Sequence, residues 1–270
     1  MIATALLAAA LGILVGCVIG GLGGGGGVLT VPALVFVLGQ NAHDATTGSV
    51  LIVGATALVG AIARVRERGV EWRTGAAFGA VGIPAAYLGT LLNRQVAPPV
   101  LLIAFACLTL LVAAAMLGRG PERADGQAEP AGPAGATVAV RHGTVTAQAV
   151  KVVACGVAVG FLTGFLGVGG GFVVVPALVL VLRMPMHLAV GTSLFVITLN
   201  AVSSVLSRGS DLHLDWTVVG PFAVTAIVAS LVAKRLASGL SGVALGRAFA
   251  ALLTVVGLFV AAQSAVAIIG

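Results

Sequence analysis

Two glycine-rich stretches carry the strongest chemical signal in this sequence. The first is a run of five glycines, Gly23–Gly27, and the second, Gly167–Gly171, reads GVGGG. Because glycine has no side chain, a ligand can approach the main chain closely at such a stretch. A half-helix that restarts after the break offers free N–H donors and a partial positive charge, so it binds an anion without a buried lysine or arginine. The two stretches therefore predict an anion-binding site.

Close helix packing is the alternative explanation for these glycines, since small residues four apart let membrane helices approach each other. Gly12, Gly16 and Gly20 have that spacing and are best explained by packing. At the two breaks, packing and ligand binding both stay open. Nucleotide binding is disfavoured, because no strand–turn–helix context surrounds the glycines.

Polar residues follow both breaks at matching positions. His43 and His187 could donate a hydrogen bond to an oxyanion or couple transport to protons, and the alternative is a helix-start residue at the membrane interface. The hydroxyl residues Thr47, Ser49, Thr192 and Ser193 open the next helices, either as caps or as donors to a ligand. The candidate substrate-binding residues are Gly23, Gly24, Gly25, Gly26, Gly27, His43, Ser49, Gly167, Gly169, Gly170, Gly171, His187, Thr192 and Ser193.

Catalytic chemistry is not indicated. The sequence contains no Ser/His/Asp or Cys/His constellation, no paired catalytic carboxylates and no metal-ligand cluster, and its three cysteines form no CxxC pair. We therefore expect no enzyme activity, no cofactor and no metal. Asp44 has no acidic counterpart in the second half, which favours a helix-boundary role. Trp72 and Trp216 have the pattern of anchors at the membrane interface.

Composition identifies the elements that must position these residues. The chain is 59% hydrophobic and only 8% charged, with a mean hydropathy of +1.17, whereas a soluble domain carries about 25% charged residues. Its apolar runs have the length that spans a hydrocarbon layer about 30 Å thick. The lipid bilayer is therefore an expected partner. The net charge of +6 does not indicate nucleic-acid binding, because the basic residues lie in short loops between the apolar runs.

The apolar runs divide the chain into two membrane-embedded halves. Each half opens with a long run that the glycines interrupt and continues with three ordinary spans. We expect a first repeat over 1–118, a polar cytoplasmic linker over 119–146 that is rich in proline and glycine, and a second repeat over 147–270. The predicted spans are Thr4–Leu38, Thr46–Ala63, Gly75–Leu92 and Pro98–Leu117, then Ala149–Leu182, Leu188–Leu206, Trp216–Ala233 and Ala244–Ile268.

An internal duplication relates the two halves. A shift of 144 residues places Gly16 on Gly160, and about half of the positions over Gly16–Ser49 are then identical without a gap. Composition alone does not explain a shared register of this kind, because it includes proline, histidine, serine, arginine and tryptophan. The matched pairs include Pro32 with Pro176, His43 with His187, Ser49 with Ser193, Arg64 with Arg208 and Trp72 with Trp216.

The distribution of lysine and arginine favours inverted repeats. If each broken run crossed the membrane once, the basic residues would divide nine to five between the two sides. If each run turns back at its glycines, the division becomes twelve to two, with only Arg94 and Arg208 on the minority side. Because loops rich in lysine and arginine stay in the cytoplasm, we expect both termini outside. Inverted repeats with paired broken segments are a recurring architecture of secondary transporters.

At these motifs the sequence resembles the sulfite exporter TauE/SafE family, also called TSUP. The stretch GFLTGFLGVGGGFVVVPALVLVLRMPMHLAVGTSLFVI resembles its signature, and GLGGGGGVLTVPALVFVLGQNAHDATTGS resembles the first-repeat counterpart. The first copy departs from the pattern with Thr-Gly-Ser at 47–49, where the second has Gly-Thr-Ser at 191–193. The resemblance implies a transporter of small sulfur-containing anions such as sulfite, sulfoacetate and other organosulfonates, acting as an exporter in the bacterial plasma membrane. The sequence contains no ATP-binding motif, so we expect a gradient-driven transporter. A passive anion channel, a transporter of another organic anion and a homodimer stay open.

Overall fold

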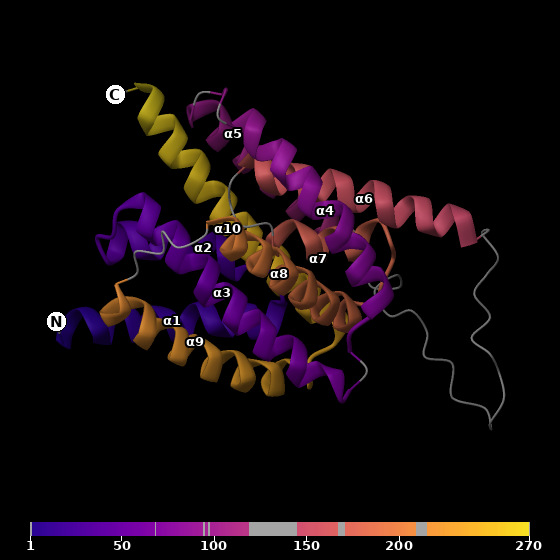
Figure 1. Cartoon of the computed structure of the whole chain (residues 1–270), viewed down its shortest axis with the longest axis horizontal. Coiled ribbons are helices and arrows are strands. Elements are labelled where there is room, and N and C mark those ends of the chain that lie inside the picture. Colours follow the sequence, from indigo (N-terminus) through magenta and orange to yellow (C-terminus); the bar gives the residue numbers. More distant parts are fainter. Residues whose placement is uncertain are drawn as a thin grey trace.

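In the part of the chain that the computed structural model describes, residues 2–67, 69–93, 95–96, 98–118, 145–166, 171–208 and 215–269, the fold is entirely helical (Figure 1). The predicted all-helical fold is confirmed. The predicted linker lies outside the described residues up to position 144, and its last two residues already belong to a helix. The helices are α1 (Ile2–Leu22), α2 (Gly26–Pro32), the π-helical turn η1 (Ala33–Val37), α3 (Ala42–Val65), α4 (Trp72–Asn93), α5 (Pro98–Leu117), α6 (Val145–Leu166), α7 (Gly171–Leu180), α8 (Met186–Arg208), α9 (Trp216–Ala237) and α10 (Gly242–Ile269).

Seven helices in the described ranges are long and apolar enough to cross a membrane. Shorter apolar helices follow each glycine break, as Gly26–Val37 in the first half and Gly171–Leu180 in the second. Each half thus opens with a full-length helix and a half-length one, as the interrupted hydropathy pattern predicts. The spans are Thr4–Leu22, Asp44–Val65, Trp72–Asn93, Ala149–Leu166, Met186–Leu206, Trp216–Ala237 and Gly242–Ala262, and Ile103–Leu117 is a further shorter apolar helix.

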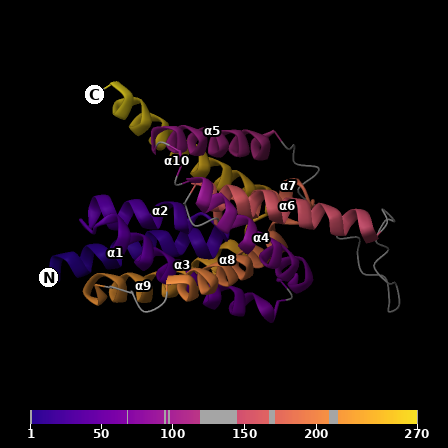
Figure 2. The same cartoon turned by 45° about the horizontal axis from the view of Figure 1, so that its top comes forward.

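The two halves exchange partners instead of packing as separate bundles. The first helix of one half packs along the fourth helix of the other, so that α1 contacts α9 and α6 contacts α4. The last helices, α5 and α10, also pack together, and Figures 1 and 2 show them side by side. Removing one half would therefore expose the packing faces of the other, and neither half has a complete core of its own.

Close glycine contacts give the register of the exchanged pairs. A Cβ atom built on Gly16 would lie 2.2 Å from the carbonyl oxygen of Ala226, and one built on Gly160 would lie 2.3 Å from that of Gly82. These two contacts are equivalent under the 144-residue shift. The contacts of Gly12 with Phe222 and of Gly20 with Ser230 recur in the same way, as Gly156 with Phe78 and Gly164 with Ala86. The duplication seen in the sequence is therefore a duplication of helix contacts as well.

The same contacts give the direction of each helix. At successive contacts between α1 and α9 the residue numbers of both helices increase, so these two helices are parallel. Gly48 lies against Val219 and Lys234 reaches Ala63, so α3 is parallel to α9 as well. Because α1 and α3 are parallel, the intervening segment α2–η1 must return the chain to the side where α1 begins.

Helices of the other group run in the opposite direction. At successive contacts between α4 and α6 the residue numbers of both helices increase, so these helices are parallel. Gly75 lies against Phe195 and Gly79 against Leu199, so α8 is parallel to α4 as well. Helix α8 opposes α3, because Gly54 contacts Ala201 while Gly60 contacts Leu194. Equivalent helices of the two halves thus point in opposite directions.

The glycines of α1 that contact α9 are expected to be essential for the close packing of these two helices. The Cβ of a Gly16→Ala variant would meet backbone atoms that cannot move cheaply, so we expect a loss of about 1–3 kcal/mol in unfolding free energy, as for other overpacked sites. Gly220→Ala is the matched control, because nothing lies within 4 Å of its Cβ position. That change should stabilise helix α9 by about 0.5–1 kcal/mol. Thermal unfolding in detergent compares the two, and equal stabilities would contradict the packing assignment.

Each half-length helix contains a proline beyond its first turn. Helix α2 begins at Gly26, and Pro32 is its last residue. Proline in a helix interior removes one hydrogen bond and displaces the preceding turn. The π-helical turn that follows accommodates this, with Leu38 N–H donating to Ala33 at 3.1 Å. Pro176 likewise lies inside α7 and not in its first turn.

Both half-length helices end in a left-handed residue at the same repeat position. In the first half this is Gly39, with a φ of +67°, and in the second it is Arg183, with a φ of +55°. Closing hydrogen bonds run from Gln40 N–H to Leu34 and from Met184 N–H to Leu178. A residue with a side chain pays a steric penalty in this conformation that glycine does not.

Arg183→Gly is therefore expected to raise the free energy of unfolding by about 1 kcal/mol. Arg183→Ala serves as the control, because it removes the same charge and keeps the left-handed strain. Chemical or thermal unfolding in detergent measures both variants. If both variants gain the same free energy of unfolding, the effect is due to the lost charge and not to backbone strain.

Candidate functional site

The two glycine breaks meet at the interface of the halves. A Cβ on Gly24 would lie 2.2 Å from the carbonyl oxygen of Gly171, and a Cβ on Gly171 would lie 2.8 Å from that of Gly24. All five glycines of the first break are buried, and so are Gly171 and the residues that follow it in α7, up to Leu178. The sequence predicted two equivalent breaks, and the tertiary structure brings their main chains into direct contact.

Gly23 ends α1 in a conformation that favours glycine. Its φ is +81°, and its N–H still donates to Ile19 at 2.9 Å. The hydroxyl of the buried Ser193 of α8 shares its single proton between the Gly23 carbonyl at 2.9 Å and the Val190 carbonyl at 2.8 Å. Ser193 therefore joins the second half to the unwound backbone of the first, which makes it the best-placed hydroxyl among the predicted site residues.

The start of the half-length helix α2 has no side-chain cap. Gly25 occupies the N-cap position with αR geometry, and Gly26 and Gly27 form the first turn. The Thr30 hydroxyl, one turn further along α2, donates back to the Gly26 carbonyl at 2.7 Å and therefore does not cap the N–H groups. The first N–H groups of a helix have no partner within the helix, and the predicted donors are therefore present at this break.

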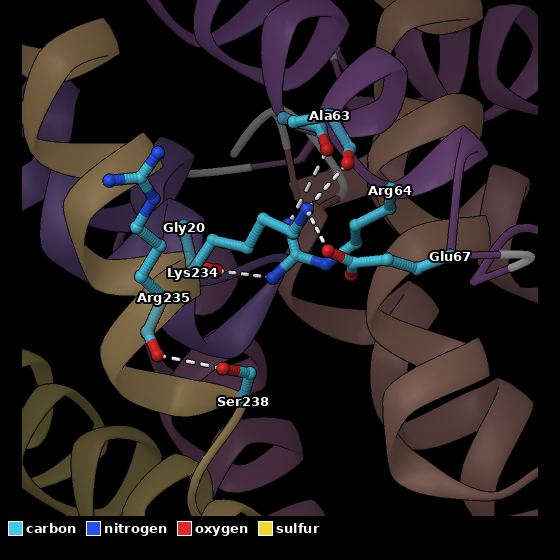
Figure 3. Close-up of polar contacts among 8 residues, drawn as sticks. Gly20, Ala63, Arg64, Glu67, Lys234, Arg235 and Ser238 are labelled. Atoms are coloured by element: carbon cyan, nitrogen blue, oxygen red, sulfur yellow. Dashed lines mark hydrogen bonds and ion pairs between the residues drawn. The ribbon is translucent and has the colours of Figure 1, made fainter.

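Arg64 is a buried residue beside the first break, and the sequence analysis placed it wrongly in a loop. Arg64 was counted among the cations of a loop, but it lies in the last turn of α3 with only 7% of its surface exposed. Its guanidinium donates to the carbonyl of Gly20, in the last turn of α1 (Figure 3). It also donates to the carbonyl of Gly60, one turn earlier in α3. One indication of this role was present in the sequence, because Arg64 is matched by Arg208 at the equivalent position of the second repeat.

The second half satisfies the equivalent carbonyls differently. At the end of α6, Asn93 of the neighbouring α4 donates to the Phe165 carbonyl at 2.6 Å. The Thr90 hydroxyl of α4 lies 3.5 Å from the Gly164 carbonyl oxygen but donates its proton to the Ala86 carbonyl at 2.9 Å. The two breaks thus touch through their main chains, but different side chains donate to the last carbonyls of α1 and of α6.

The hydroxyl residues are not helix caps. Helix α3 begins at Ala42 and α8 at Met186, so Thr47, Ser49, Thr192 and Ser193 lie between one and two turns inside their helices, and all four are buried. Asn41 caps α3 instead, accepting from Asp44 N–H at 3.1 Å, and the Asn41 amide donates to the Asp44 carboxylate at 2.7 Å. The boundary role expected for Asp44 is therefore confirmed. The Thr192 hydroxyl accepts from Glu71 N–H at 3.0 Å, across the interface between the halves.

Among the described residues, His187 lies away from the break. His187 is exposed in the first turn of α8, about 9 Å along the helix axis from Ser193 at 1.5 Å per residue. This is the geometry of the helix-start alternative. His43 lies in the first turn of α3, and its side chain is outside the described residues, as are Gly167, Gly169 and Gly170. Trp72 and Trp216 open α4 and α9, with 47% and 67% of their surfaces exposed.

The seven long apolar helices found in the described ranges, together with the two half-length helices, indicate a multi-pass membrane protein. A family model for "Sulfite exporter TauE/SafE" matches residues 8–260, which is nearly the whole chain. The chain belongs to this family of membrane transporters. No solved structure gives a significant match.

Three relatives carry the name of a probable membrane transporter protein. A "probable membrane transporter protein" of Xylella fastidiosa is 34% identical over 84% of this chain and 83% of its own length. The "probable membrane transporter protein YunE" of Bacillus subtilis is 27% identical over 76% and 78%. A relative from Methanocaldococcus jannaschii, also named a probable membrane transporter protein, is 23% identical over 72% and 70%.

Proposed function

We propose that this protein is a secondary transporter that exports small sulfur-containing anions, such as sulfite, sulfoacetate or other organosulfonates, across the bacterial plasma membrane. The main-chain contact between Gly24 and Gly171 carries the proposal, because it joins the two repeated breaks at one point inside the protein. Family membership supports the assignment to transport. The family model's own description, a sulfite exporter, supports the substrate class.

The substrate site is formed mainly by the uncapped N–H groups at the start of α2, because the hydroxyls of Thr30 and Ser193 already donate to carbonyl oxygens. Helix N-termini bind anions through N–H donors and the helix dipole. Arg64 lies close to the first break, but its guanidinium donates to two main-chain carbonyls. The anion is therefore held mainly by main-chain dipoles, which bind weakly enough to release it again. Because Gly24 and Gly171 already touch, the two breaks must separate slightly to admit an anion.

The two repeats have inverted orientations in the membrane, with both termini outside. Opposite directions of α3 and α8 support this arrangement, and so does the position of the basic residues. Those on described helices and turns gather at one end of the bundle, except Arg208 at the end of α8. That end is cytoplasmic by the positive-inside rule. The cations there are Arg64, Arg66, Arg73, Lys151, Arg183, Lys234, Arg235 and Arg247.

Flux measurements on proteoliposomes test the proposal. Purified protein should move sulfite or a sulfonate at a rate that saturates with concentration and responds to an imposed gradient. Empty liposomes and chloride or acetate as test anions are the controls. Flux that rises linearly with concentration would instead identify a passive anion channel. Saturable flux of a carboxylate without any flux of sulfur anions would contradict the substrate class and leave the transport mechanism standing.

A further inference from the structure

A cationic cleft lies between the ends of α3 and α9, apart from the glycine breaks. It has a volume of about 500 Å³. Three cations and one carboxylate line it, namely Arg66, Lys234, Arg235 and Glu67, and the rest of its wall is apolar. The lining therefore carries a formal excess of two positive charges, which suits an anionic ligand.

The cations of this cleft differ in their availability. Lys234 forms an ion pair with Glu67 at 2.7 Å and also donates to the Ala63 carbonyl, which holds α9 against the end of α3 (Figure 3). Within the described part of the chain, the guanidinium groups of Arg66 and Arg235 form no hydrogen bond or ion pair. Both residues are exposed. In Figure 3 the Arg235 guanidinium points away from the ion pair. Two arginines are thus free to bind a ligand, while Lys234 and Glu67 shape the floor of the cleft.

The apolar wall of the cleft belongs to a membrane-spanning helix. Val228, Leu231 and Val232 line the cleft and expose 56%, 38% and 53% of their surfaces. They lie within the span Trp216–Ala237, just before its cationic end. At that depth the surroundings of an exposed valine or leucine are lipid acyl chains, so the cleft opens toward lipid on one side and toward the headgroups on the other.

The dimensions of this surface fit a phospholipid. The exposed apolar stripe continues to Val224, with 62% of its surface exposed. From Val224 to Arg235 the helix rises about 16 Å at 1.5 Å per residue, which is close to half of a hydrocarbon layer about 30 Å thick. One leaflet's acyl chain can therefore lie along α9 while its phosphate reaches the two arginines.

We propose that this cleft, lined by Arg66, Lys234, Arg235 and the α9 stripe from Val224 to Val232, binds an anionic phospholipid of the leaflet at the cation-rich end of the bundle. Basic pockets between membrane helices on the cytoplasmic side bind anionic headgroups in this way. The site is independent of the transported anion, because it shares no residue with the glycine breaks.

Native mass spectrometry of the purified full chain tests the proposal, with phosphatidylglycerol and phosphatidylethanolamine as probes. The protein should retain phosphatidylglycerol in preference to phosphatidylethanolamine. Each surface cation contributes about fivefold in affinity for anionic lipid, so Arg66→Gln with Arg235→Gln should weaken retention about 25-fold. Arg73→Gln with Arg247→Gln is the matched control, since both arginines are exposed at the same end but lie outside the cleft. The control pair should retain the lipid.

Several outcomes would overturn this site. Equal retention of the two lipids, or an equal loss in the control pair, would assign lipid binding to diffuse charge. Competition by millimolar inorganic phosphate, together with unchanged retention in Leu231→Asn, would indicate a free-anion site. A change from dimer to monomer in the Arg66/Arg235 variant, with no change in lipid retention, would identify the cleft as a protein interface.

Discussion

Gly24→Val is expected to abolish flux of the transported anion in proteoliposomes. A Cβ at this position would lie 2.2 Å from the Gly171 carbonyl oxygen and 3.0 Å from a methyl group of Val175. The first contact is with main chain, so it cannot be relieved by a rotamer change, and the valine side chain would fill the space between the breaks that the anion has to enter. We expect a fall of at least about a hundredfold, which corresponds to a barrier increase of about 2.7 kcal/mol.

The control for this prediction is Gly21→Ala, three residues earlier in the chain. Nothing lies within 4 Å of a Cβ at Gly21, so this variant should transport at the normal rate. Protein yield, monodispersity and thermal unfolding are measured for both variants, because a loss of flux is informative only in protein that folds. Normal flux in folded Gly24→Val would show that the contact between the breaks has no role in transport.

Arg64→Met is expected to destabilise the protein by about 2–3 kcal/mol. The guanidinium donates to the carbonyls of Gly20 and Gly60 from a buried position, and a hydrogen bond from a charged group contributes about 1.5–3 kcal/mol. Methionine fills similar space but donates no hydrogen bond, so the Gly20 carbonyl at the end of α1 would be left unpaired inside the protein. Unfolding in detergent, by heat or by denaturant, measures the difference.

Arg66→Met separates this effect from the loss of a charge. Arg66 is two residues further along the chain and exposed, and its side chain has no hydrogen bond within the described part of the structure. Its replacement should leave the unfolding free energy within about 0.5 kcal/mol of the parent value, as for most surface substitutions. If both variants lose the same unfolding free energy, the loss is due to the change in net charge and not to the hydrogen bonds of Arg64 with the two carbonyls.

Local pattern alone predicted several features of this protein. Hydropathy located the helices, and the glycines located both interruptions, because unwound backbone inside a membrane needs residues that tolerate it. The repeat register, read from pairs such as Pro32 with Pro176, reappears in the helix contacts of Gly16 and Gly160. Helix starts were less accurate, since Asn41 caps α3 ahead of the hydroxyl residues that the sequence suggested.

The partners of individual side chains depended on the tertiary structure. Ser193 bonds to Gly23 across 170 positions of sequence, and Arg64 reaches Gly20 from another helix. No local pattern specifies such contacts, because they depend on how helices from different halves are placed. An arginine at the end of an apolar run looks the same in sequence whether it faces water or a helix end, and packing alone distinguishes the two.

The sequence by itself determined that the chain is a duplicated, membrane-embedded helical protein with one backbone break in each half. These properties follow from composition, spacing and repetition, which act along the chain. Only the tertiary structure decided that Gly24 and Gly171 touch, that α1 pairs with α9 and α6 with α4, and that Arg64 is buried. These contacts arise because each half leaves packing faces that only the other half can cover.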